Sequence, residues 1–367
     1  MPTDPASRPA LAGLDPGGIS ASAIDDESER RTHDRRTLRL GIGVTITFLI
    51  AMLYDWTLAY LAPIFVIPLL KAPVGPSLGA AARMLLGTFV VFVGGLCSAG
   101  LAQVYPAFFL MALFPALFLT FRFLLRGGSV LMTLFALCGL ILLPLMAGTR
   151  IEVGRSVALS FVQNIAVSLA VTMLMYALIP PLPTEPAAKP KPVLPQDEVT
   201  RRAALLTMIT GSYAVLYLCF GWSNVHTPIY IALYACSLDL SRGSAAAKGI
   251  LAANIAAGLL AMLLYQLTLM APYVPFVAVM ILTVNLVLAR MILSKAPWAQ
   301  LASFALSVLM ILYGDSIRPF SDSGGANFLD RFGELAMAAI WAIGALTILE
   351  TYFPTRSAVV DNGEPHR

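Results

Sequence analysis

The sequence predicts an all-α, polytopic transmembrane helical bundle of about twelve spans, arranged as two parallel six-span repeats. Charged residues form 12% of the 367-residue chain and hydrophobic residues 58%, and the mean hydropathy is +0.81. Soluble proteins carry roughly 25% charged residues, about twice the fraction in this chain. A composition this apolar suits a protein whose surface faces a lipid bilayer. Uncharged stretches such as 84–106, 129–148 and 249–273 match the roughly 20 apolar residues that cross a hydrocarbon core.

The apolar runs, in chain order, predict spans at 37–54, 58–70, 84–103, 106–121, 128–147, 156–180, 203–220, 227–238, 249–268, 272–290, 297–314 and 332–352. An even number of spans puts both termini on one side of the membrane. With the N-terminus in the cytoplasm, four of the 24 lysines and arginines fall outside, namely Arg150, Arg155, Arg318 and Arg331. The positive-inside rule therefore predicts an inner-membrane protein with cytoplasmic termini.

The spans divide the chain into five parts. Residues 1–34 are polar and rich in charge, which predicts a disordered cytoplasmic tail. A first repeat at 35–180 and a second at 201–354 flank a Pro-rich cytoplasmic linker at 181–200, and residues 355–367 form a second tail. We interpret Arg35, Arg36 and Arg39 as anchors that hold the first helix at the cytoplasmic face.

Weak internal similarity supports a duplication. Trp222 follows Trp56 by 166 positions, and Pro228 corresponds to Pro63 after one deletion. The Pro-Thr pairs at 183–184 and 354–355 end the two repeats alike, at an offset of 171. Repeats of six spans run parallel, related by an axis along the membrane normal.

The second and eighth predicted spans are short and broken by proline. Pro63 and Pro68 interrupt the run 58–70, and Pro228 opens the run 227–238. In duplicated transporters, broken segments at matching positions point to the binding site. The alternative is a pair of re-entrant hairpins whose prolines are purely structural.

Asp239 and Arg242 follow the eighth span and are the strongest candidates for chemistry. The carboxylate of Asp239 would carry a coupling proton, while Arg242 would set the pKa of that carboxylate or hold an organic anion. The alternative is an interfacial ion pair of little energetic weight. The first repeat has no acid that matches Asp239 and offers Lys71 instead, and Tyr230 and Tyr234 supply aromatic faces for an amphipathic anion.

Other polar residues have two readings each. Glu334 either takes up protons at the periplasmic face or forms an i,i+3 pair with Arg331. Asn164 belongs to a stripe at every fourth residue from Ser156 to Thr172, which faces either a neighbouring helix or an aqueous path. Trp56 is read as a residue of the interfacial aromatic belt.

Several motifs are missing from the sequence. It contains no G-x-x-x-x-G-K-[ST] phosphate loop, no H-E-x-x-H and no G-x-S-x-G. The four cysteines lie in apolar runs without metal-ligand spacing. We therefore predict no enzyme activity, cofactor, metal site or nucleic-acid partner, and expect transport driven by an ion gradient.

The stretch "RRTLRLGIGVTITFLIAMLYDWTLAYLAPIFVIPLLKAPVGPSLG" at 35–79 resembles the fusaric-acid-resistance and aromatic-acid-exporter family of bacterial inner-membrane proteins. The likeness lies in the Arg-led first helix, the short second helix with "APIFV" and the Pro/Gly turn. The resemblance implies proton-driven efflux of small aromatic or organic acids with a periplasmic membrane-fusion adaptor. Larger family members carry a sizeable cytoplasmic domain where this chain has only the linker.

Two alternatives stay open at this point: a major-facilitator-type carrier of another small solute, and a non-transporting scaffold subunit of an envelope complex. A homo-oligomer is compatible with each of them. Asp239→Asn separates carrier from scaffold, because a scaffold tolerates this change and a proton-coupled carrier does not.

Overall fold

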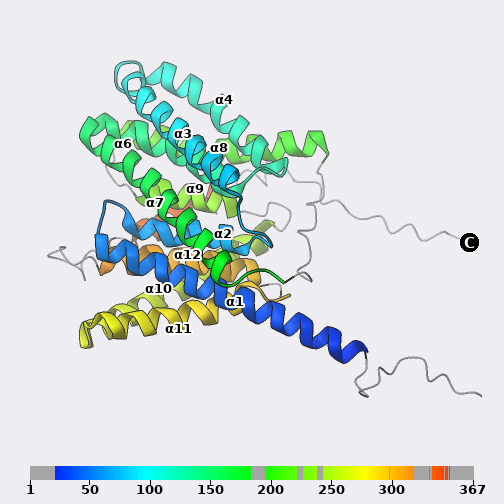
Figure 1. The fold of residues 1–367 in the computed structure, drawn as a ribbon. Helices are drawn as coiled ribbons and strands as arrows, with labels where there is room; N and C mark the ends of the chain where they lie inside the picture. Colours follow the sequence, from blue (N-terminus) through cyan, green and yellow to red (C-terminus); the bar gives the residue numbers. More distant parts are fainter. Residues whose placement is uncertain are drawn as a thin grey trace, which may run out of the picture.

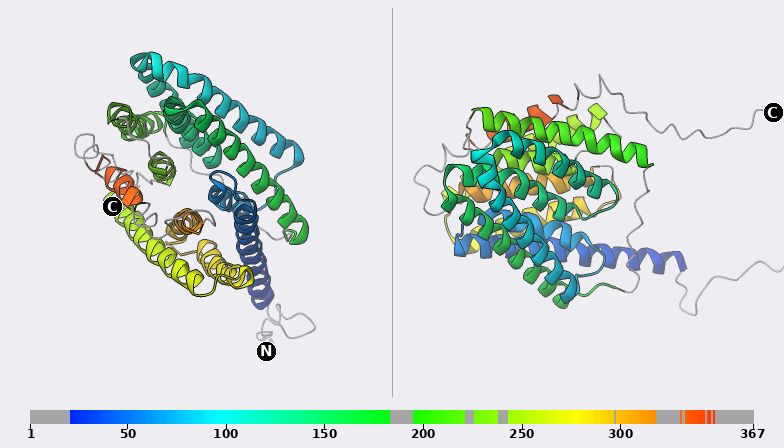
Figure 2. Two further views of the ribbon diagram at one scale, coloured as in Figure 1. Left: turned by 90° about the vertical axis from the view of Figure 1, so that its left-hand side faces the viewer. Right: turned by 90° about the horizontal axis from the view of Figure 1, so that it is seen from above.

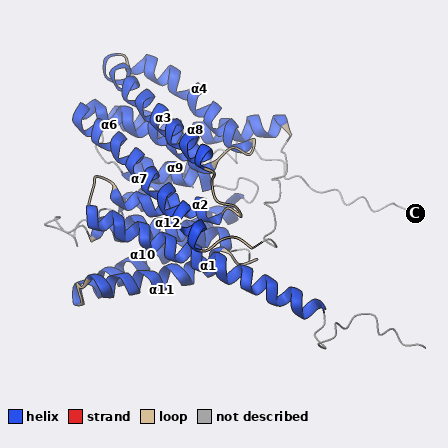
Figure 3. Cartoon of the chain, in the orientation of Figure 1, coloured by secondary structure: helices blue, strands red, loops and turns tan. Residues whose placement is uncertain are grey.

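The computed structural model describes residues 21–182, 195–220, 226–237, 243–296, 298–317, 330, 333–342, 344–345 and 347. These residues form helices and connecting turns, with no strand among them (Figure 3). The helices are α1 (Ala21–Tyr54), η1 (Ala59–Leu61), α2 (Ala62–Lys71), α3 (Leu78–Val104), α4 (Pro106–Leu125), α5 (Val130–Leu137), η2 (Cys138–Leu142), α6 (Leu143–Thr149), α7 (Ile151–Leu178), α8 (Gln196–Phe220), α9 (His226–Ser237), α10 (Gly243–Met270), α11 (Val274–Ile292) and α12 (Ala299–Ser316). A further helical segment runs from Gly333 to Ala342.

The all-helical prediction is confirmed for the described residues. Nine of their helical stretches are long and apolar enough to cross a membrane, and three shorter apolar helices lie at 59–71, 227–236 and 333–342. Each predicted span from 37–54 to 297–314 contains a helix. Length and composition thus indicate a multi-pass membrane protein.

Helix α1 begins at Ala21, inside the stretch 1–34 that the sequence predicts to be a disordered tail. Arg31 pairs with Glu27 one turn earlier at 2.5 Å, and the Thr32 hydroxyl donates to the Ser28 carbonyl. Such i,i+4 contacts extend a helix beyond its apolar part. The 34-residue helix is about 51 Å long, and its N-terminal end projects past the other helices (Figure 1).

The fifth predicted span is one helical stretch with a change of pitch. A π-helical turn, η2, separates α5 from α6. Pro144 follows it and has no N–H to donate to the carbonyl of Leu140, so the turn there widens. Gly95 of α3 approaches this turn so closely that an added Cβ would overlap the carbonyl oxygen of Gly139.

The interior and the outside of the bundle differ clearly. In the most apolar windows, 78% of residues are buried for 130–147 and 72% for α12, against 22% for each of α3, α4 and α11. The view along the helices places α9 and α12 between the outer layers (Figure 2, left). The outer helices expose large apolar side chains such as Phe89, Met111 and Val279, as expected of a surface that faces lipid.

Aromatic rings fix α2 in the first half of the chain. Phe65 of α2 meets Phe135 edge-on with centroids 4.8 Å apart, and Phe92 stacks on Phe161 at 4.6 Å. These rings come from α2, α5, α3 and α7. The short second helix is therefore wedged among longer helices rather than lying at a membrane surface.

Candidate functional site

The entry into α2 is held by α7. Leu58, just before η1, adopts the left-handed conformation with φ +57°. The fully buried Asn164 donates through Nδ2 to the Leu58 carbonyl at 3.0 Å and accepts from Trp56 Nε1 at 2.9 Å. Buried backbone groups outside regular helix need such partners. The Trp56 indole N–H is thus directed at a buried amide.

The polar stripe of α7 continues along α2. The Ser168 hydroxyl lies 2.9 Å from the carbonyl oxygen of Ala62 and 2.7 Å from that of Asn164. Ala62 precedes Pro63, which is buried in the first turn of α2 and has no N–H of its own. The structure therefore places Asn164 and Ser168 against the start of α2, where Pro63 lies, so this side of the stripe faces protein.

Lys71 occupies the last turn of α2, where the two halves of the chain meet. Its Nζ donates to Ser303 Oγ of α12 at 3.2 Å. Arg36 of α1 donates to the Lys71 carbonyl oxygen at 3.1 Å and so caps the end of α2. One lysine thereby connects α1, α2 and α12.

Arg39 corrects the interpretation of the first arginines as surface anchors, because its side chain is fully buried. Its guanidinium carbon lies 4.1 Å from the centroid of the Tyr176 ring, a cation–π contact. The Tyr176 hydroxyl donates to the Ala72 carbonyl, just beyond α2. We call Arg36, Arg39 and Lys71 the basic cluster.

Pro228, Tyr230 and Tyr234 lie on α9, and all three are buried. The Tyr234 hydroxyl accepts from Asn254 Nδ2 of α10 at 2.7 Å and lies 3.4 Å from the Leu335 carbonyl oxygen. These contacts tie α9 to α10 and to the C-terminal segment.

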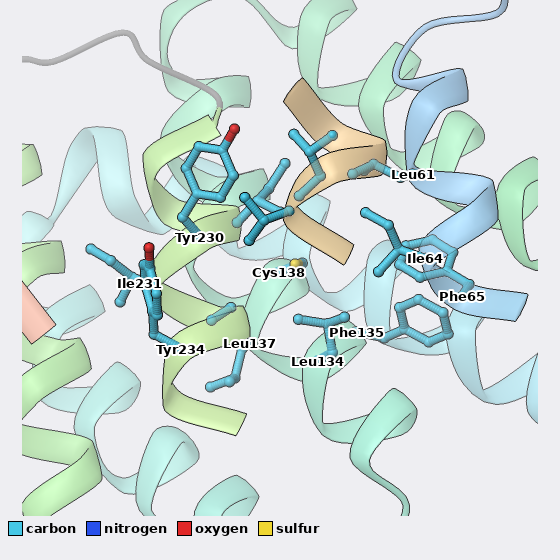
Figure 4. Close-up of a cluster of buried hydrophobic side chains, with 14 of the residues drawn as sticks. Leu61, Ile64, Phe65, Leu134, Phe135, Leu137, Cys138, Tyr230, Ile231 and Tyr234 are labelled. Carbon is cyan, nitrogen blue, oxygen red and sulfur yellow. The ribbon is translucent and has the colours of Figure 1, made fainter. Parts of the chain in front are cut away.

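Apolar side chains occupy the space between α2 and α9. The α5–η2 stretch contacts both short helices. Leu137 and Cys138 pack there together with Leu61 and Tyr230 (Figure 4). The prediction that the two broken segments line a path is not tested by this packing, which belongs to one conformation.

Glu334 lies on the C-terminal helical segment, and it is partly buried. Its carboxylate acts electrostatically on the phenols of Tyr213 and Tyr217 of α8, which the sequence had not singled out. The role of Glu334 in proton uptake stays a prediction.

Asp239 and Arg242 lie outside the described residues. Their pairing, and their proximity to Lys71, Tyr230 and Tyr234, stay predictions. Within the described part of the chain, no group of three or more His, Cys, Asp or Glu side chains could hold a metal ion.

Sequence reasoning missed the roles of Arg39, Tyr176 and Ser303. One signal was present: Gly43 follows Arg39 by one helical turn, and a small residue beside a cation allows close packing. An added Cβ at Gly43 would approach Met175 Cγ to 3.2 Å. Ser303 had no signal, because its contact with Lys71 joins residues 232 positions apart.

A family model described as "Protein of unknown function (DUF2955)" matches residues 36–179. The match nearly coincides with the predicted first repeat and includes Pro63, Lys71 and Asn164. No curated protein and no solved structure matches the chain. The resemblance to aromatic-acid exporters therefore stays a prediction.

Proposed function

We propose that this chain is a secondary transporter of the bacterial inner membrane, driven by the proton motive force, that exports small aromatic or organic acids. The observation that carries the proposal is the basic cluster, with a fully buried Arg39 over an aromatic ring. Cations inside a membrane protein are costly and mark ion or substrate pathways. Guanidinium and ammonium groups beside an aromatic face suit an aromatic carboxylate.

The proposal includes the twelve-span architecture with two parallel repeats. It is supported by contacts that occur in pairs: α1 packs on α11 as α4 packs on α8, and α2 packs on α12 as α5 packs on α9. If α1–α7 and α8 onward are equivalent halves, α1 corresponds to α8, α2 to α9, α4 to α11 and α5–α6 to α12. The two contacts of each pair then join corresponding helices. A two-fold axis along the membrane normal produces this pattern.

Residue positions at these contacts agree with the repeat. Asn285 of α11 donates to Thr45 of α1, and Gly211 of α8 lies against Phe114 of α4. Thr45 and Gly211 differ by 166 positions, as the two tryptophans of the short segments do. Phe114 and Asn285 differ by 171, the offset of the Pro-Thr pairs. These matches support the proposal that corresponding helices of the two repeats meet at corresponding residues.

The coupling proton is assigned to carboxylates of the second half. Glu334 with its neighbouring phenols serves proton uptake from the periplasm, and Asp239 serves release toward the cytoplasm. The cationic first half holds the anion. The periplasmic adaptor rests on the family resemblance alone.

The test is efflux of a labelled hydroxybenzoate from preloaded cells, with and without a protonophore. We compare the wild type with Lys71→Gln and Asp239→Asn at matched membrane levels. Arg83→Gln is the control, because Arg83 is an exposed cation at the start of α3. Expected are fast efflux by the wild type and Arg83→Gln, and at least about a tenfold loss for the other two, on the order of one buried charge contact.

Equal efflux from the wild type and from empty cells would refute the proposal for this substrate class. Efflux that survives in Lys71→Gln and Asp239→Asn would remove these residues from the path. Transport of neutral solutes instead would favour the major-facilitator-type alternative. No transport together with stable association with other envelope proteins would favour the scaffold alternative.

A further inference from the structure

A cavity of about 800 Å³ lies between α8 and the C-terminal helical segment, away from the basic cluster. The lining residues lie on one face of α8 and on one face of the C-terminal segment. They include Ala204, Leu205 and Met208 of α8, and Met337, Trp341 and Gly344 of the C-terminal segment. Small residues create the space, because an added Cβ at Gly344 meets nothing within 4 Å. We call this feature the α8 groove.

The α8 groove opens toward the outside of the bundle. Met208 is 52% exposed, Met337 53% and Ile340 69%, although all three are large and apolar. In a multi-pass membrane protein such exposed apolar side chains meet lipid chains. The molecules with direct access to the groove are therefore those dissolved in the bilayer.

Among the described residues that line the groove, Arg201 is the charged one, at the end near the start of α8. Glu198 pairs with Arg201 at 2.9 Å and with Arg202 at 2.6 Å, and neither Glu198 nor the neighbouring Asp197 lines the groove. The charge that reaches the groove is thus positive, and it lies at the predicted cytoplasmic surface. An acidic headgroup complements it.

The dimensions of the groove fit one leaflet. From Arg201 to Ser212 the lining extends over eleven residues of α8, or about 16 Å at 1.5 Å per residue. Half of a hydrocarbon core is about 15 Å deep. An acyl chain whose headgroup is held at Arg201 would reach the bilayer midplane at Ser212. The groove is therefore far longer than a small aromatic acid.

The corresponding place in the first half is filled. At the offsets of the repeat, Leu205 takes the position of Arg39 and Thr347 that of Tyr176. Arg39 and Tyr176 pack on each other in the space between α1 and α7. Leu205, which lines the groove, is smaller than arginine and leaves room at this position of α8.

From the length, the lipid-facing opening and the cation Arg201, we propose that the α8 groove binds one acidic phospholipid of the cytoplasmic leaflet. One acyl chain lies along Met208 and Trp341, and the phosphate lies at Arg201. The choice of leaflet rests on the proposed topology, whereas binding in the groove does not depend on the proposed transport activity.

The test is native mass spectrometry of the full-length protein in detergent with dioleoyl phosphatidylglycerol or dioleoyl phosphatidylcholine. The wild type is expected to retain one phosphatidylglycerol, with about fivefold preference over phosphatidylcholine, as one basic residue near a surface provides. Gly344→Leu places a branched side chain in the path of the acyl chain and is expected to weaken retention of both lipids. Gly94→Leu adds the same side chain where α3 has open space, and is expected to bind as the wild type does.

Arg201→Gln is expected to remove the preference and leave equal, weak binding of both lipids, whereas Arg201→Lys keeps it. Arg290→Gln, at an exposed cation in the last turn of α11, is the charge control. Equal retention of the two lipids by the wild type would overturn the proposal. So would identical binding by Gly344→Leu and Gly94→Leu, or displacement of phosphatidylglycerol by a hydroxybenzoate, which would assign the groove to substrate. If Gly344→Leu does not fold, the wild-type preference and the Arg201 variants decide.

Discussion

Asn164→Ala tests whether α7 holds the short helix α2 in place. The wild-type amide is fully buried and makes two hydrogen bonds, with the Leu58 carbonyl at 3.0 Å and with Trp56 Nε1 at 2.9 Å. Hydrogen bonds inside membrane proteins contribute about 0.6 kcal/mol on average and up to about 1.7. Loss of two such bonds, together with the small cavity left by the amide, predicts a loss of about 2 kcal/mol.

The assay is reversible unfolding in mixed micelles of increasing SDS content, followed by circular dichroism. Gln163→Ala is the matched control, because Gln163 is the neighbouring amide and is exposed. It is expected to change the free energy of unfolding by less than about 0.5 kcal/mol. A shift of the same size in both variants would refute the reasoning.

A double-mutant cycle isolates the bond to the indole. Trp56→Phe removes this bond in the wild type but has nothing to remove in Asn164→Ala. The two changes are therefore expected to be less than additive, by about 0.6 to 1.7 kcal/mol. Strict additivity would mean that the Asn164–Trp56 bond contributes nothing.

The remaining predictions concern helix contacts. Gly95→Ala forces a methyl group into the carbonyl of Gly139 and should destabilise by about 1–3 kcal/mol, whereas Gly94→Ala, with open space beside it, should be neutral in the same SDS assay. Asn285→Ala loses the 2.9 Å bond to Thr45 and should cost about 0.6–1.7 kcal/mol. Lys295→Gln breaks the exposed ion pair with Glu29 and should change the free energy of unfolding by less than about 1 kcal/mol. A larger loss in Lys295→Gln than in Asn285→Ala would contradict the expectation that the buried bond matters more.

The helices could be predicted from the sequence because hydropathy alone locates them. The positions and shortness of α2 and α9 followed from the proline pattern at 58–70 and 227–238. The start of α1 at Ala21 did not, since a polar helix beyond the membrane has no hydropathic signal. Nor did η2, whose cause is a missing donor at Pro144 within an otherwise uniform apolar run.

The candidate site was predictable only in part. The four-residue spacing of the α7 stripe identified Asn164, and the contact with α2 explains why polar groups are needed there. Burial of Arg39 depends on the ring of Tyr176, which is far away in sequence. A local pattern of basic residues cannot separate a cation at the membrane surface from one inside the bundle.

The described hydrogen bonds distinguish motion between the predicted halves from motion within them. Within each half, the short helix is fixed by polar side chains of a long one, as Asn164 fixes the start of α2 and Asn254 holds Tyr234 of α9.

Side-chain hydrogen bonds also join the predicted halves, and they include Lys71 to Ser303, Asn285 to Thr45, and the exposed Lys295 to Glu29. Movement of the predicted halves against each other would have to break the Lys71–Ser303 bond, which belongs to the proposed anion site. Binding of an anion at Lys71 would compete directly with the contact to α12, which gives the substrate a physical means to favour the rearranged state.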